Sequence, residues 1–78
     1  MKRFALLVLR NNANWVMAET TAVDKAAAIA HFNNLVTLVS DPKTGATVPL
    51  GLDAEGYRKG DPQVGDSITY TVAEFYNS

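Results

Sequence analysis

The side chains with the most chemical potential are one histidine and several carboxylates. His31 is the only histidine among 78 residues, and the chain has no cysteine. A zinc site needs several histidine or cysteine ligands, and a catalytic base needs a positioned partner. Asp24 shares the predicted helix face of His31 but lies about 10 Å away along the helix axis. We therefore expect His31 to be a surface residue and predict neither a metal site nor a cofactor.

Four carboxylates occupy the polar segment 51–66: Asp53, Glu55, Asp61 and Asp66. Paired acids hydrolyse glycosides only when their separation is fixed, which nothing in this segment indicates. Its start, Asp53-Ala-Glu55-Gly56, resembles a calcium loop but lacks the third ligand before the glycine and the terminal bidentate acid. Nucleophile and phosphate-binding motifs are also missing. We predict no catalytic residues and a protein that is not an enzyme.

Aromatic and arginine side chains are the better candidates for function. Such residues dominate the binding energy of protein interfaces. Trp15 begins a predicted strand beside a turn, where it either packs at the rim of the core or anchors a partner. We predict five partner-binding residues: Trp15, Tyr57, Arg58, Tyr70 and Tyr76.

The charge and composition limit the possible partners and the location. Net charge is −1, whereas nucleic-acid binders carry a basic surplus, so we do not expect nucleic acid as a partner. A small domain without cysteine suits a reducing cytosol. The apolar run at 4–9 is too short for a signal sequence or for a membrane span of about 20 residues. We predict a cytoplasmic protein that does not contact a membrane.

Alternating apolar residues and turn signals predict the order of elements in one domain, residues 1–78. Strands at 2–10 and 15–20 form a hairpin around the asparagine-rich turn 11–14. A helix follows, with strands at 35–40, 46–50 and 67–76 after it; Pro49 places the second of these three at a sheet edge. Residues 51–66 read as a long polar loop.

The predicted helix begins at Thr21 as N-cap and ends near Asn33. Asp24, three residues after Thr21, is its partner in a capping-box arrangement. Asn33-Asn34 is a plausible left-handed cap. The apolar stripe of the predicted helix consists of mostly small residues: Ala22, Val23, Ala26, Ile29 and Ala30. Phe32 lies off this stripe, so it either wraps an edge of the core or is exposed.

One segment resembles a known type of strand. Residues 64–72, Val-Gly-Asp-Ser-Ile-Thr-Tyr-Thr-Val, are similar to the strand opening in repeated β-sandwich domains of bacterial surface proteins. The resemblance covers nine residues, and the alanine-rich helix departs from an all-β sandwich.

The strand at 4–9 is apolar on both faces, which sets the main structural question. One helix is about 10 Å wide and shields two to three strands spaced about 4.8 Å apart. We predict an α+β fold of order β-β-α-β-β-β, with a mainly antiparallel sheet of four to five strands and one helix on one face. The second face is then buried by curling of the sheet, by segment 51–66, or by another chain.

The predicted function is a non-enzymatic protein–protein interaction module. By analogy of size and composition, such a chain fits a small accessory or inhibitory protein of a phage or mobile element that occupies a surface of its partner. One alternative is a self-assembling structural subunit, a homodimer or a larger assembly. Another is a weak single-stranded nucleic-acid binder that uses arginines and strand aromatics.

Overall fold

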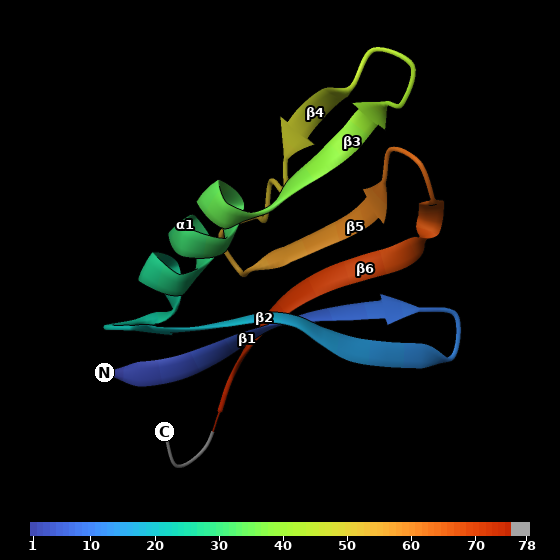
Figure 1. Cartoon of the computed structure of the whole chain (residues 1–78). Helices are drawn as coiled ribbons and strands as arrows, with labels where there is room; N and C mark the ends of the chain where they lie inside the picture. The colour runs from blue at the N-terminus through green and yellow to red at the C-terminus, as the bar shows by residue number, and fades with distance from the viewer. Residues whose placement is uncertain (76–78) are drawn as a thin grey trace.

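The computed structural model describes residues 1–75 and confirms the α+β class. Four antiparallel strands form one sheet in the order β2-β1-β6-β5, and β3 and β4 form a separate two-stranded sheet (Figure 1). The elements are β1 (Lys2–Arg10), β2 (Ala13–Ala22), α1 (Lys25–Leu35), β3 (Thr37–Asp41), β4 (Ala46–Pro49), β5 (Tyr57–Asp61) and β6 (Gly65–Glu74).

The first two strands form the predicted hairpin, with a bulge in its middle. Asn11 turns the chain with φ at 55°, a left-handed conformation that asparagine tolerates. The register shifts between Leu6, which pairs with Ala18, and Leu7, which pairs with Val16. Met17 is therefore an extra residue on β2. In a strand without a bulge, side chains alternate strictly between the two faces of the sheet. Because of the bulge, the β2 side chains from Ala18 onward lie on the face opposite to the one expected from this alternation.

The core lies on the face of β1 formed by Phe4, Leu6 and Val8, all 0% exposed. We term this the helix side of the sheet, and the face formed by Ala5, Leu7 and Leu9 the open side. Strand β6 continues the helix side through Ile68, Tyr70 and Val72. The cover comes from α1 and from residues in and after the β3–β4 hairpin: Ala28, Ile29, Phe32, Leu38, Leu50 and Leu52.

The helix begins later than the sequence predicts, and a different face of it is buried. Strand β2 stays paired with β1 as far as Ala22, so Thr21 is held in the strand and is not the N-cap. Asp24 caps the helix instead, accepting a hydrogen bond from the Ala27 N–H at 2.9 Å. Val23 is then 67% exposed, while Phe32 is fully buried in the core.

The helix end also differs from the prediction. The cap residue, Val36, is extended, with φ at −110°, and its N–H bonds the Phe32 carbonyl at 3.0 Å. Asn33 and Asn34 do not form a left-handed cap, because both remain inside α1.

Segment 51–66 was predicted to be a loop but contains the extra strand β5. Its turn into β6, Asp61-Pro-Gln-Val-Gly65, repeats the Asp-Pro-x-x-Gly pattern of the predicted turn at 41–45. In both turns the aspartate accepts a backbone N–H two residues later, at 2.9 Å for Lys43 and 2.7 Å for Gln63. The segment therefore extends the sheet at its edge and does not fold across the open side.

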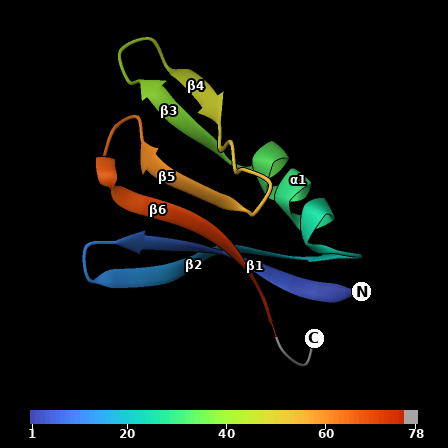
Figure 2. The same ribbon diagram turned by 180° about the vertical axis from the view of Figure 1, so that it is seen from behind.

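The two sheets lie side by side without a shared ladder. Figures 1 and 2 show β3 beside β5, from the front and from behind. The Gln63 side-chain amide donates to the Ser40 carbonyl at 3.2 Å, and this bond links the β5–β6 turn to β3. The β3–β4 hairpin thus lies next to the edge of the main sheet that β5 forms.

Candidate protein-interaction surface

Two of the four carboxylates in segment 51–66 hold its turns. Asp53 Oδ1 accepts the backbone N–H groups of Glu55 at 3.0 Å and Tyr57 at 2.9 Å. Asp61 Oδ1 accepts those of Gln63 and Val64. Within residues 1–75, no group of three or more histidine or acidic side chains is placed to hold a metal ion. The Oδ1 atoms of Asp53 and Asp61 thus hold the backbone of these two turns.

Among the described residues, Tyr70 has the clearest shift in pKa. The Tyr70 hydroxyl donates to Asp61 Oδ2 at 3.0 Å, and the tyrosine is 2% exposed. Burial, and then the bond to Asp61, raise the pKa of Tyr70 to about 12. The phenol therefore stays neutral at physiological pH, and we assign it a structural role.

Arg58 is also engaged inside the molecule. Its Nε donates to the Gly60 carbonyl at 3.0 Å, and its guanidinium donates to the Leu50 carbonyl at the same distance. The side chain therefore links β5 to the segment that follows β4.

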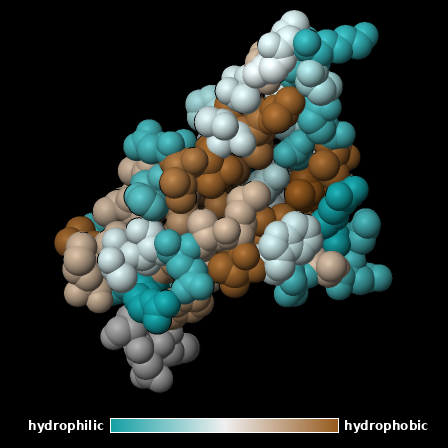
Figure 3. Space-filling model, viewed as in Figure 1, coloured by the Kyte–Doolittle hydropathy of each residue, from teal (hydrophilic) through white to brown (hydrophobic). Residues whose placement is uncertain are grey.

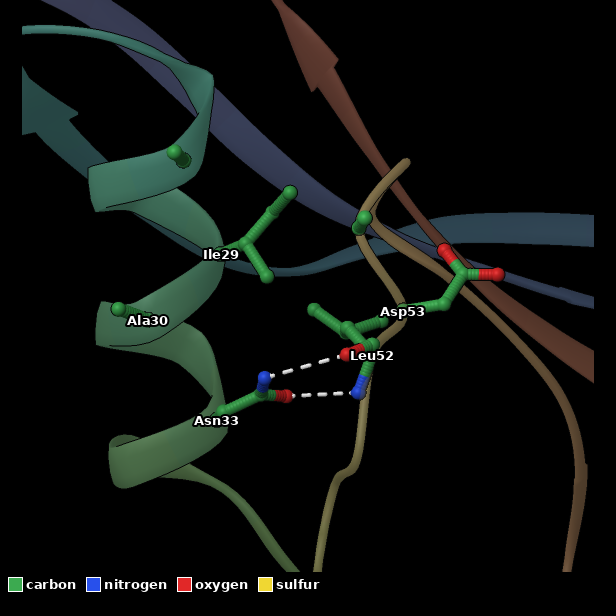
Figure 4. A pocket seen from close by; sticks show the side chains of 7 residues that line it. Ile29, Ala30, Asn33, Leu52 and Asp53 are labelled. Carbon is green, nitrogen blue, oxygen red and sulfur yellow. Dashed lines mark hydrogen bonds between the residues drawn. The ribbon is translucent and has the colours of Figure 1, made fainter.

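A shallow pocket lies between α1 and residues 52–54, with a volume of about 340 Å³ (Figure 4). The Asn33 amide spans it: Oδ1 accepts the Leu52 N–H at 2.8 Å and Nδ2 donates to the Leu52 carbonyl at 3.4 Å. The other lining residues are mostly small or apolar: Ala26, Ile29, Ala30, Asp53 and Ala54. The bonds of Asn33 and Asp53 within the chain account for the polar groups here, so the pocket has the character of a packing groove.

The open side of the sheet is less apolar than β1 alone suggests. Ala5 is fully buried between its cross-strand partners Glu19 and Ala73. Arg3 forms an ion pair with Glu19 at 2.8 Å. Next along β1, Leu7 is half-buried and Leu9 is 41% exposed, beside Thr71 and Thr69 of β6. Apolar exposure on this side is therefore concentrated toward the turn of the β1–β2 hairpin.

Four of the nine exposed large hydrophobic residues within 1–75 belong to that end of the hairpin. They are Leu9 and, at 44 to 46% exposure, Trp15, Val16 and Met17; together we term them the hairpin surface. Val16 and Leu9 lie on the open side, Trp15 lies on the helix side opposite Val8, and Met17 is the bulge residue. Figure 3 shows a hydrophobic patch near the middle of the hairpin and another over β3–β4.

The backbone of β2 adds a second property to the hairpin surface. Within the described chain β2 pairs only with β1, so its outer edge presents unpaired N–H and C=O groups. The strand is ten residues long, contains no proline, and has a single charged residue, Glu19. A long, weakly charged edge is a template for another strand.

The structure divides the sequence-predicted residues into three groups. Trp15 and Tyr57 are exposed, but they lie on opposite faces of the sheet, since Tyr57 pairs with Thr71 of the open side. Arg58 and Tyr70 are held inside by the bonds described above. Tyr76 lies outside the described residues.

Sequence reasoning did not select Leu9, Val16 or Met17. The available signal was a run of eight residues without charge, 11–18, around the hairpin turn and along its second strand.

Comparison of the chain with protein-family models, curated protein sequences and solved structures finds no match. Within residues 1–75, no helix has the length and apolar character needed to cross a bilayer.

Proposed function

We propose that this chain is a non-enzymatic protein–protein interaction module that binds another polypeptide through the hairpin surface. The observation that carries the proposal is the coincidence of exposed apolar side chains with a free strand edge on β2. Backbone pairing supplies affinity, and side chains on the two faces supply selectivity, which is the general logic of strand addition. Trp15 is the aromatic anchor of this surface.

The role of the polar residues supports the same proposal. Asp53, Asp61, Arg58 and Tyr70 make bonds that hold the fold. These four side chains are therefore weaker candidates for partner contact than the exposed apolar residues of the hairpin surface. From the absence of cysteine we also infer a reducing compartment, the cytoplasm, for this small domain.

Photo-crosslinking in the source cells tests the proposal. A photoreactive phenylalanine analogue replaces Trp15 in one variant and Thr47, exposed on β4, in the control. We expect protein adducts from position 15 and few from position 47. Equal adducts from both positions, or none from either, would contradict the proposal.

A further inference from the structure

We infer that the polypeptide bound at the hairpin surface is a second copy of this chain, joined by antiparallel pairing of β2 with β2. The inference rests on the proposed function and names its partner. Two identical strands that pair antiparallel form a two-fold symmetric interface, in which each edge satisfies the other. The sequence and the bulge of β2 supply the reasons for choosing a second copy.

The bulge limits the registers in which β2 pairs with itself. Before Met17 the helix-side residues of β2 are Ala13 and Trp15; after it they are the even-numbered Ala18, Thr20 and Ala22. Residues directly opposite each other in a ladder share a face. A two-fold axis between Val16 and Met17 sets Ala13 opposite Thr20 and Trp15 opposite Ala18, so these four helix-side residues face helix-side residues of the second copy. An axis through Met17 would oppose Trp15 to Glu19, which lies on the open side.

The side chains fit this register. Trp15 lies opposite Ala18 of the second copy, so a large residue meets a small one. Asn14 lies opposite Glu19, so the single charge of β2 meets a neutral amide and not its own copy. Val16 lies opposite Met17, both about half exposed in the single chain. Moving the axis by one residue, to between Met17 and Ala18, keeps the faces matched but sets Val16 against Glu19.

The helices do not obstruct the pairing. Helix α1 follows the C-terminal end of β2, whereas the turn at Asn11–Asn12 precedes its N-terminal end. Antiparallel pairing brings the α1 of each copy to the turn of the other, so the two helices lie at opposite ends of the joined sheet. The result is one eight-stranded sheet with β5 at both outer edges.

A cysteine scan tests this arrangement directly, because the chain has no cysteine of its own. Single cysteines replace Asn14, Val16, Met17 or Glu19, and Thr47 on β4 is the control. In the inferred register, the same residue in the two copies is offset along the strands. The offset is about 3.4 Å for residues 16 and 17 and about 17 Å for residues 14 and 19. A disulfide needs Cα atoms within about 7 Å of each other.

We expect oxidised dimers from Val16→Cys and Met17→Cys and few from the other three variants, with circular dichroism checking that each variant is folded. Sedimentation of the unmodified protein should show a dimer that Val16→Lys dissociates and Val39→Lys on β3 does not. Uniform cross-linking, a maximum at another position, or a monomer at all concentrations would overturn the inference. A monomeric protein that still gives heterologous adducts from position 15 would retain the proposed function without the second copy.

Discussion

Strands β2 and β5 form the two opposite edges of the same sheet, and they differ in how well their unpaired backbone groups are protected from pairing with another strand. β5 has five residues, includes Arg58, Lys59 and Gly60, and changes register before its end. Its Arg58 bonds two carbonyls, and the β3–β4 hairpin lies alongside. β2 is twice as long and carries one charge. Natural edges usually carry protections such as those at β5, and β2 has fewer of them, which is why we propose β2 as the binding edge.

Substitution at Gly56, just before β5, should give the largest effect. Gly56 has φ at 80°, and an added Cβ would lie 3.0 Å from Val72 Cβ. Gly56→Val should destabilise the fold by roughly 3 kcal/mol, through backbone strain and overpacking. Urea unfolding measures this. Gly45→Ala, at φ 75° with nothing within 4 Å, should cost only about 1 kcal/mol. Equal costs would mean that packing at Gly56 is looser than described.

Removing the guanidinium of Arg58 should have the next largest effect. Arg58→Met leaves the Leu50 and Gly60 carbonyls without this donor and should cost about 1–2 kcal/mol. Lys59→Met, next to it and exposed, should change the free energy of unfolding by less than about 0.5 kcal/mol. Hydrogen exchange should rise in β5 for the first variant alone. If both variants behave alike, Arg58 does not protect this edge.

The Tyr70–Asp61 bond predicts a dependence on pH beside β5. The folded-state pKa of Tyr70, about 12, lies above the ordinary value of 10.0, so folding favours the protonated phenol. This contribution is complete below pH 10 and is lost as the pH rises toward 12. Tyr70→Phe should destabilise the protein by about 1 kcal/mol at neutral pH. It should also make the alkaline decline in stability shallower.

Tyr57→Phe is the matched control, since Tyr57 is exposed on the same sheet. It should leave the stability at neutral pH unchanged. Urea midpoints measured from pH 8 to pH 11.5 distinguish the two variants. An unchanged decline in Tyr70→Phe would show that Tyr70 does not titrate as described.

Val16→Lys on β2 should have the smallest effect on the fold itself. Val16 is 46% exposed, so the monomer should change by less than about 0.5 kcal/mol. A dimer becomes more stable as protein concentration rises. The melting temperature of the unmodified chain and of Val39→Lys should therefore rise with concentration, and that of Val16→Lys should not. A common concentration dependence in all three would place the association away from β2.

Much of this fold is readable from local patterns, and the errors have identifiable physical causes. The β1–β2 hairpin and the turn at 41–45 have strong asparagine, proline and glycine signals, and both were predicted. β5 was missed because Arg58, Lys59 and Gly60 resemble a loop, and because its pairing with β6 depends on tertiary context. The recurrence of Asp-Pro-x-x-Gly at 61–65 was the usable signal.

The helix and the surface were harder to predict. The N-cap moved from Thr21 to Asp24 because continued pairing of β2 with β1 outweighed a local capping preference. The buried helix face is the one with Ala28, Ile29 and Phe32, and the small residues of the predicted stripe did not indicate this orientation. Trp15 and Tyr57 were selected by residue type alone, whereas the free edge of β2 depends on strand order, which no local pattern specifies.

The Asn33 amide gives the molecule a chemical vulnerability. It holds Leu52 through one donor and one acceptor, so a single side chain replaces a missing strand partner for that residue. Hydrolysis of the amide to a carboxylic acid would remove the donor and bring a negative charge toward the Leu52 carbonyl. Such a change at this one position would weaken the attachment of Leu52 to α1, while the β1–β2 hairpin, to which Asn33 makes no bond, would stay intact.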